Sequence, residues 1–365
     1  MRSKLILSTV GTSLLTNQLE GNQRKELFDV SNLKEDSYSG ALLGLIEYVK
    51  DKLKTTLRTA SEADLKRLGA EFNGILGIYG GTFPEDTQDT HVLISTDTFQ
   101  GKETAKILEE YLNSQGFKNV FTYCPKGLTT ENKNTFINGI KDLLRWLDKD
   151  LNIESYKSSG YEIIFNLTGG FKSLQGYLNT IGMFYADRMV YIFESRQSEL
   201  IEIPQLPIEV NPQIFEDNAV DFACMYADIP QQAAGIPNLM KEEYDRNQYL
   251  LSDWGILVWN KIKSSILSKK LYDFPSLKFE ESFKKDFHKA TNQQRVELQE
   301  ILAKVSALLS TNTNGIAILK QHGGLQYDNY SGKHSTIGHF RINQGDRVSA
   351  VARENELILR HFGQH

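Results

Sequence analysis

The chain has 365 residues, of which 40% are hydrophobic and 24% charged, and its formal net charge is −5. This length has room for two or three domains with buried cores, and the composition is ordinary for a globular protein. The net negative charge argues against a protein coated all over by nucleic acid. From residue 276 onward, however, 12 Lys and Arg stand against 9 Asp and Glu, and six of the seven histidines lie there. We therefore expect a separate basic module at the C-terminal end.

Cysteine usage and hydropathy limit where the protein can work. Cys124 and Cys224 are the only cysteines, which excludes a disulfide framework and a zinc-binding spacing. The chain enters its first apolar run directly after Met-Arg-Ser-Lys, without the hydrophobic region of a signal peptide. No apolar run reaches the roughly 20 residues that cross a bilayer. We expect a cytoplasmic protein without membrane contact, and we predict no metal and no cofactor.

Residues 1–203 alternate between short apolar runs, typical of strands buried on both faces, and amphipathic segments. Thr129 and Thr130 are plausible caps ahead of one such helix. The alternation predicts an α/β domain with a doubly wound parallel sheet. The expected strands are Leu5–Val10, Ile75–Tyr79, Val92–Ser95, Val120–Tyr123, Tyr161–Leu167, Met189–Phe193 and Leu200–Ile203. The expected helices are Gly40–Leu53, Ser61–Phe72, Gly101–Ser114, Glu131–Asp148 and Lys172–Ala186.

A connector is expected over residues 204–275. Pro204, Pro207 and Pro212 end the alternation and favour a stiff linker. Between Glu242 and Lys270, a short amphipathic stretch predicts a small helical or winged-helix-like segment.

The order of elements changes over residues 276–365. A short strand is followed by two helices, a glycine-containing polar stretch, and three runs that alternate like strands. Tight turns with Asn, Asp and Gly separate these runs, which is a hairpin signal. We expect a small α+β domain with an antiparallel sheet. Its elements are predicted at Leu277–Phe279, Ser282–Ala290, Asn292–Leu309, Ile337–Asn343, Arg347–Arg353 and Glu356–Phe362.

Two glycine turns are candidates for an anion site. The first predicted strand runs into Gly11–Ser13, and a later one into Thr168–Lys172 ahead of a helix. Backbone N–H groups and the helix dipole face an anion at such places, and ligands of doubly wound sheets bind at the carboxyl ends of the strands. Thr96–Lys102 adds a third turn on the same rim. None of them matches a dinucleotide or Walker motif. The alternative is that the glycines only allow close helix–sheet packing.

These turns resemble those of the CRISPR-associated Rossmann fold (CARF), in particular its ring-nuclease-like sensors. The resemblance covers about residues 1–203, and it implies a homodimer whose crevices hold a cyclic oligoadenylate, with tetra-adenylate as the expected ring. It also implies that Ser13 and Lys172 match the family's ring-cleaving pair. Chemically, Lys172 can neutralise a phosphate, and Ser13 can orient a ribose hydroxyl or a phosphate oxygen. The expected ligand-binding residues are Gly11, Thr12, Ser13, Thr96, Asp97, Gly101, Thr168, Gly169, Gly170 and Lys172.

Arginines and histidines gather on the last predicted strands. His339 and Arg341 share one strand face, because side chains two apart point the same way. Such groups suit metal-free RNA cleavage, in which the ribose 2′-OH attacks the adjacent phosphate: histidine exchanges protons and arginine clamps the phosphate. The alternative is a set of scattered exposed basic residues. The predicted catalytic residues are His339, Arg341, Arg347, Arg360 and His365.

The order of elements from residue 276 resembles a RelE-type toxin domain, an mRNA interferase fold. The resemblance implies that Arg347 holds the phosphate and that His365 takes the place of an acid-supplying residue. The family's usual lysine pair is replaced by His339 and Arg341, and Tyr327 or Tyr330 would have to stand in for its tyrosine.

A competing motif overlaps the last predicted strand. Residues 360–365 satisfy Arg-x-x-x-x-His, the signature of helical HEPN ribonucleases. The preceding residues alternate like a strand and a glycine interrupts the motif, so we interpret this match as chance.

Three hypotheses follow. The first is a homodimeric CRISPR ancillary ribonuclease that binds cyclic oligoadenylate and cuts RNA, with mRNA on ribosomes as the expected substrate. The second is a ring nuclease that degrades cyclic oligoadenylate, with an inert tail. The third is a ligand-controlled transcription regulator; residues 242–270 carry few of the Lys and Arg that DNA contacts need, which disfavours it.

Overall fold

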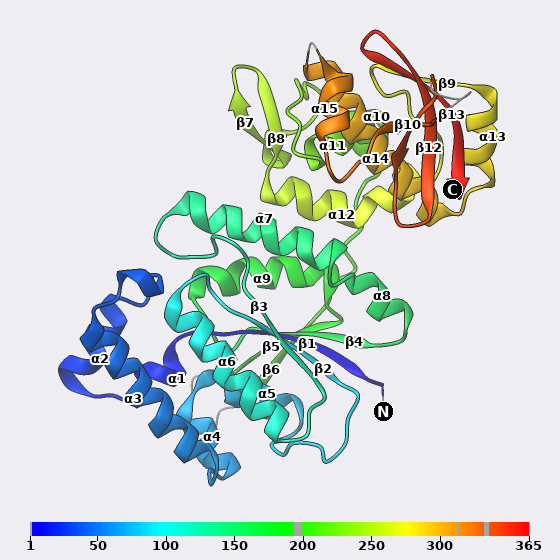
Figure 1. Cartoon of the computed structure of the whole chain (residues 1–365). Helices are drawn as coiled ribbons and strands as arrows, with labels where there is room; N and C mark the ends of the chain where they lie inside the picture. The colour runs from blue at the N-terminus through cyan, green and yellow to red at the C-terminus, as the bar shows by residue number, and fades with distance from the viewer. Residues whose placement is uncertain (1, 193–198, 313, 332–335, 365) are drawn as a thin grey trace. The chain divides into compact units, whose positions relative to one another are not determined.

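The structure, a computed structural model, describes residues 2–192, 199–312, 314–331 and 336–364. The chain divides into two compact units, Met1–Ile208 and Glu209–His365, which are described separately (Figure 1). Among the helices of the described residues, none is long and apolar enough to cross a membrane.

The first unit is built on a six-stranded sheet in the order β3-β2-β1-β4-β5-β6. All neighbouring strands are parallel except the β5–β6 pair, which is antiparallel. The strand order reverses between β1 and β4, and this is the switch point at which doubly wound sheets bind ligands. The predicted fold class is therefore confirmed. The strands are β1 (Lys4–Thr9), β2 (Thr90–Ile94), β3 (Asn119–Tyr123), β4 (Glu162–Asn166), β5 (Arg188–Ile192) and β6 (Leu200–Pro204).

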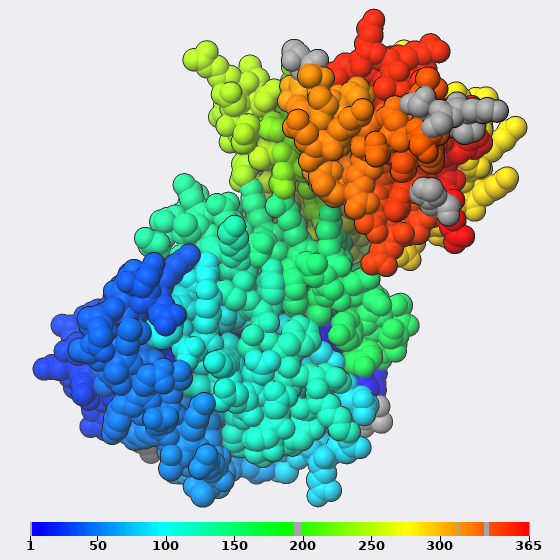
Figure 2. Space-filling model, viewed as in Figure 1, coloured from blue at the N-terminus to red at the C-terminus, as the bar shows by residue number. Residues whose placement is uncertain are grey.

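Helices cover both faces of this sheet. Leu53, Phe72 and Leu108, from α3, α5 and α6, are fully buried in one shared core, whereas α7 and α9 lie on the opposite side of the sheet (Figure 1). Figure 2 shows the side chains of the blue and cyan helices covering the sheet on the face in view. The helices are α1 (Ser13–Thr16), α2 (Gly21–Asp29), α3 (Gly40–Leu57), α4 (Glu62–Leu68), α5 (Ala70–Ile78), α6 (Phe99–Ser114), α7 (Lys133–Lys149), α8 (Ile153–Ser158) and α9 (Lys172–Tyr185), with a short 3-10 helix at Glu35–Ser37.

Some local predictions for this unit are wrong. The helix predicted over Ser61–Phe72 is two helices, because the extended backbone of Gly69 separates α4 from α5. Ile75–Tyr79 is not a strand, because residues up to Ile78 continue helix α5. A short apolar run reads the same in a buried helix as in a buried strand, so periodicity could not separate them. Thr129 and Thr130 do not cap α7 either, since the side chain of Asn132 accepts the backbone N–H of Thr135 at 3.0 Å.

Residues of the predicted connector form the start of the second unit. Phe215, Phe222 and Trp259 are fully buried, and their rings pack on one another. This aromatic core joins helix α12 to two short helices, and a hairpin that the sequence did not predict precedes α12. The elements are α10 (Gln213–Asp217), α11 (Ala219–Tyr226), a 3-10 turn at Asn238–Met240, β7 (Lys241–Asp245), β8 (Gln248–Leu251) and α12 (Asp253–Leu267).

The rest of the second unit follows the predicted order of strand, two helices and three strands. Its sheet has the order β10-β11-β12-β13-β9. It is mixed rather than purely antiparallel, because β9 pairs with β13 in parallel. The sequence also missed α15 and β10, which lie in the glycine-containing stretch. The elements are β9 (Leu277–Phe279), α13 (Glu281–Lys289), α14 (Asn292–Thr311), α15 (Gly315–Gln321), β10 (Asp328–Asn329), β11 (Gly338–Arg341), β12 (Asp346–Arg353) and β13 (Glu356–Gln364).

Candidate functional site

A pocket of about 550 Å³ opens at the switch point of the first sheet. The turn after β1 and the turn after β4 form one side of it, and residues of α1, α2 and the start of α5 complete the lining. Of the predicted ligand-binding residues, the structure brings six together here: Gly11, Thr12, Ser13, Thr168, Gly169 and Gly170. Lys172 is the first residue of α9, and its side chain is exposed next to this turn.

The two turns touch each other through their backbones. A Cβ atom on Gly11 would approach the backbone nitrogen of Gly170 to 3.0 Å. The hydroxyl of Thr9 donates a hydrogen bond to the carbonyl of Gly169, and Gly170 has a φ of +86°, which favours glycine. The glycines therefore do serve close packing, and that packing holds the two turns together as one wall of the pocket.

A buried carboxylate that the sequence did not single out lies behind this wall. The backbone N–H of Gly11 donates to Oε1 of Glu71 at 2.9 Å, and the hydroxyl of Ser13 donates to Oε2 at 2.9 Å. Glu71 is only 1% exposed. The N–H of Gly11, which we expected to face an anion, is thus occupied by an internal carboxylate.

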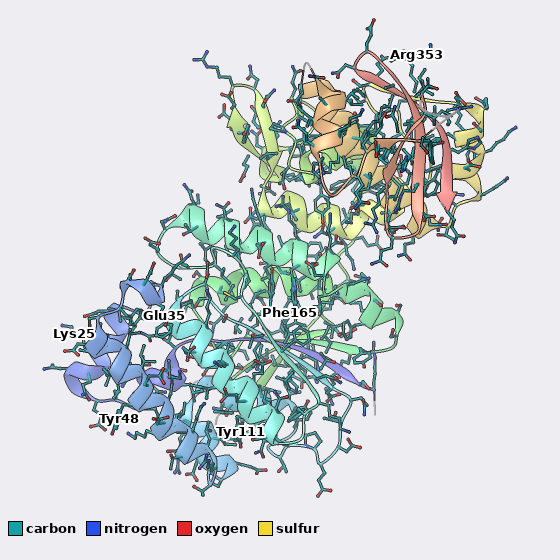
Figure 3. The ribbon with its side chains drawn as sticks, viewed as in Figure 1. Lys25, Glu35, Tyr48, Tyr111, Phe165 and Arg353 are labelled. Atoms are coloured by element: carbon teal, nitrogen blue, oxygen red, sulfur yellow. The ribbon has the colours of Figure 1, made fainter. Side chains whose placement is uncertain are left out.

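Helix α2 supplies four further pocket residues that the sequence reasoning missed, namely Gly21, Arg24, Lys25 and Phe28. Arg24 donates a hydrogen bond to the side chain of Asn17 at 3.3 Å, and Lys25 projects from the helix (Figure 3). Phe28 is 68% exposed, which is unusual for a ring of this size. Two cations and an exposed aromatic ring on neighbouring turns of one helix form a sequence pattern that could have predicted an anionic, aromatic ligand.

The third predicted turn, Thr96–Lys102, has a different structural role. Thr98 caps helix α6 by accepting the N–H of Gly101, and its hydroxyl also bonds that of Thr96 at 2.9 Å. Burial alone would raise the pKa of Asp97, but hydrogen bonds from Lys102 (2.7 Å) and from the backbone of Gly127 (3.1 Å) outweigh it and lower that pKa. Among the described residues, Thr96, Asp97 and Gly101 are not part of the lining of the pocket at Gly11.

In the second unit, the strand register assembles a polar face on the sheet. His339 lies directly opposite Ser349, which lies directly opposite His361. Arg341 lies directly opposite Arg347. Residues opposite one another in antiparallel strands share a face, and the intervening residues of these strands are buried. The predicted residues His339, Arg341 and Arg347 therefore do come together.

The two arginines converge on a single carbonyl. Nε of Arg341 donates to the backbone oxygen of Asn343 at 3.0 Å, and Nη1 of Arg347 donates to the same oxygen at 2.9 Å. The side chain of Asn343 accepts the N–H groups of Gly345 and Asp346, which fixes the turn between the strands. Within the described residues, neither guanidinium forms an ion pair with a carboxylate. Like charges directly opposite destabilise a sheet, so this pair is poised to gain from an anion.

Arg360 is not aligned with the other arginines. A bulge between Ser349 and Ala350 shifts the register, so that Arg360 has no residue directly opposite it. Its Nε lies 3.4 Å from a carboxylate oxygen of Glu280. His361, which the sequence did not put forward as catalytic, takes the aligned place, and its Nδ1 is 3.1 Å from Oδ2 of Asp286 on α13.

Two tyrosines were expected as stand-ins for the tyrosine of the RelE-type family. Tyr330 stacks on His339 with ring centroids 4.5 Å apart, whereas Tyr327 is buried beneath the sheet, and burial raises the pKa of its phenol. Tyr330 is therefore the better-placed tyrosine.

The Arg-x-x-x-x-His match begins in strand β13 rather than in a helix, as we expected for a chance match. His365 lies outside the described residues, so its role stays a prediction.

Taken together, the fold defines a Rossmann-like unit with a pocket at its switch point, followed by an α+β unit with an arginine-rich sheet face. Residues 66–206 match the family model described as CRISPR-associated protein (Cas_APE2256). The first unit thus resembles a CRISPR-associated domain of the CARF type, which confirms the resemblance inferred from its sequence.

Solved structures also match a part of the chain. One is a copper-bound mutant toxin from Helicobacter pylori, and another is the conserved hypothetical protein HP0894 from the same organism. Each is 21% identical and covers 24% of this chain and 92% of its own, with TM-scores of 0.18 and 0.14, respectively. No curated protein matches this chain significantly.

Proposed function

We propose that this chain is a CRISPR ancillary ribonuclease whose first unit binds a cyclic oligoadenylate and whose second unit cuts RNA. The observation that carries the proposal is the pair of arginines, Arg341 and Arg347, which face each other on the open side of a sheet without a carboxylate partner in the described part of the chain. Such a pair matches the charge and fork geometry of a phosphodiester.

The chemistry on this face is metal-independent transfer to the ribose 2′-oxygen. A base takes the proton of the 2′-OH, the oxygen attacks the adjacent phosphorus, and an acid protonates the leaving 5′-oxygen. Arg341 and Arg347 would stabilise the charge on the phosphorane. His339 stands at one end of the aligned row and His361 at the other, two strand spacings or about 10 Å apart. Two of the three histidines His339, His361 and His365 would serve as base and acid.

The pocket of the first unit suits the proposed activator. A cyclic oligoadenylate offers phosphates, ribose hydroxyls and adenine rings. Arg24 and Lys25 in the lining and Lys172 beside it can neutralise phosphates, and Phe28 can stack on an adenine. We keep tetra-adenylate as the expected ring and a homodimer as the expected assembly, both from the CARF resemblance.

The test is RNA cleavage by the purified full chain with and without an activator. Cyclic tetra-adenylate and cyclic hexa-adenylate are compared at equal concentration, and linear tetra-adenylate is the matched control. We expect cleavage of mRNA, free or ribosome-bound, to rise strongly with one ring and to stay low with the linear form. Cleavage that no ring changes, or no cleavage at all, would contradict the proposal.

A second candidate function is cleavage of the ring itself in the first unit. The specific observation that favours it is the hydrogen bond between Ser13 and the buried Glu71, which pairs a pocket hydroxyl with a carboxylate.

A further inference from the structure

Glu71 occupies a space made for it. It lies in the first turn of α5, where the helix dipole favours a negative charge. Cβ atoms on Gly69 and Gly169 would approach its side chain to 2.9 Å, so only glycine at both positions leaves room for it. Burying a carboxylate is costly unless it is hydrogen-bonded or paired. Its hydrogen bonds come from Gly11 and Ser13, and among the described residues no Lys or Arg pairs with it.

This arrangement decides what Ser13 can offer to a ligand. A serine hydroxyl has one proton and two lone pairs. Because the proton of Ser13 is directed to Glu71, the lone pairs remain for the pocket that Ser13 lines. An acceptor repels a phosphate oxygen and attracts a hydroxyl donor. Of the two roles open to Ser13 from its sequence, the structure favours binding a ribose hydroxyl.

A phosphate next to that ribose is expected on the side of the pocket that lies away from Glu71. The negative charge of Glu71 disfavours a phosphate directly at Gly11. Arg24 and Lys25 line the pocket from α2, and Lys172 begins α9 next to the Gly169–Gly170 turn. A hydroxyl at Ser13 and a phosphate near these cations are the two groups that must lie side by side for transfer to a 2′-oxygen.

We propose that Glu71 is a positioning residue that orients Ser13 and accepts its proton during cleavage of a bound cyclic oligoadenylate. In this step the ribose 2′-OH passes its proton to Oγ of Ser13 as Ser13 passes its own to Glu71. The 2′-oxygen bonds to the adjacent phosphorus, and the bond from phosphorus to the 5′-oxygen breaks. The leaving oxygen takes a proton from Lys172 or water, and the product is a linear oligoadenylate with a 2′,3′-cyclic phosphate. The inference rests on the proposed function, because it requires the pocket to bind the ring.

The test compares Glu71→Gln with the unchanged full chain, using cyclic tetra-adenylate. Two quantities are measured: the dissociation constant of the ring and the single-turnover rate of its cleavage. We expect binding to change by less than about threefold and cleavage to fall at least about 100-fold, the usual effect of losing a general base. Glu62→Gln, in the exposed first turn of α4, is the matched control.

A second variant separates the proton-accepting role from a packing role. Glu71→Asp keeps a carboxylate but shortens the side chain, whereas Glu71→Gln keeps the shape but removes the base. The proposal expects Asp to retain more cleavage than Gln, and a purely structural role expects the reverse. Because Glu71→Asp and Glu71→Gln are compared by their single-turnover cleavage rates, the two roles can still be distinguished if one variant is less stable.

The outcomes also separate this inference from the proposed function. Ring binding and ring-activated RNA cleavage without ring cleavage would overturn the role of Glu71 and leave the proposed function standing. Absence of ring binding would overturn both. Wild-type cleavage rates in Glu71→Gln would overturn the role of Glu71 alone.

Discussion

The two candidate sites treat their polar groups in opposite ways. In the pocket of the first unit, the groups that hold the wall together are satisfied internally: Gly11 and Ser13 donate to Glu71, and Thr9 donates to Gly169. On the sheet face of the second unit, two guanidinium groups face each other and donate to backbone carbonyls, with the side-chain oxygen of Gln326 as a further contact of Arg341. The wall of the first site is held by internal hydrogen bonds, and in the second site the two positive charges have no carboxylate partner among the described residues.

This difference indicates which kind of substitution each site tolerates least. Close backbone packing makes the pocket sensitive to shape, because an added methyl group has no space. The sheet face is sensitive to charge, because an anion between like charges relieves their repulsion. We therefore expect substitutions of charge to act most strongly in the second unit and substitutions of size in the first.

The largest effect is expected from the double substitution Arg341→Ala and Arg347→Ala. Both groups that stabilise the phosphorane would be lost, so activated RNA cleavage should fall by about 10³-fold or more, since a single such donor is worth about 10²–10³. The measurement is the single-turnover rate of RNA cleavage at saturating activator. Affinity for the ring should not change.

Arg353→Ala is the matched control for this pair. Arg353 is an exposed arginine at the far end of β12, away from the paired arginines (Figure 3). It should leave the rate within about twofold, as surface substitutions usually do. If the double variant cleaves RNA at the normal rate, the arginine face is not the site of cleavage.

The next effect concerns the cations of the pocket. Arg24→Ala with Lys172→Ala should weaken ring binding about 100-fold, since each charge-assisted hydrogen bond contributes about 1.5–3 kcal/mol and about 1.4 kcal/mol is tenfold. Isothermal titration calorimetry measures it. RNA cleavage at a saturating ring concentration should be preserved. Lys118→Ala, which loses only an exposed ion pair with Asp86, is the control; equal weakening in both variants would rule out a specific role.

Much of the first site could be predicted from the sequence because its turns are local. Gly11–Ser13 and Thr168–Lys172 each follow an apolar run, and the strand order brings such ends together. Glu71 could not be found, because its run reads as an ordinary helix start and its partners lie 58 and 60 residues away. The run at Ile75 was misassigned because burial on all sides hides the helical period.

The second site was less predictable because it depends on register. Arg341 and Arg347 flank a tight turn, so their pairing follows from the hairpin itself. Arg360 and His361 are adjacent in sequence, and which of them faces His339 is set by a bulge between Ser349 and Ala350. A single extra residue reverses the face of every side chain beyond it. No pattern in the sequence marks this bulge.

A test of shape in the first unit compares two glycines of one segment. Gly169→Ala would place a Cβ against the carbonyl of Thr9 and the side chain of Glu71, and it should lower the free energy of unfolding by about 1–3 kcal/mol. Gly176→Ala, in α9 with open space around it, should raise that free energy by about 0.5–1 kcal/mol. Urea denaturation measures both. Equal effects at the two positions would contradict the close-packed wall.

The smallest predicted effect concerns which of two neighbouring residues in β13, Arg360 or His361, takes part in RNA cleavage. His361→Ala should lower RNA cleavage about tenfold, the loss of one contact to a charged group, because the register aligns His361 with Ser349 and His339. Arg360→Ala should lower it by less than about threefold, because Arg360 lies at the bulge beside Glu280 and a half-exposed ion pair contributes little. Single-turnover rates at saturating activator measure both. The reverse order would mean that Arg360 turns to the RNA when it binds, as the sequence predicted, and that the register seen without RNA does not define the site.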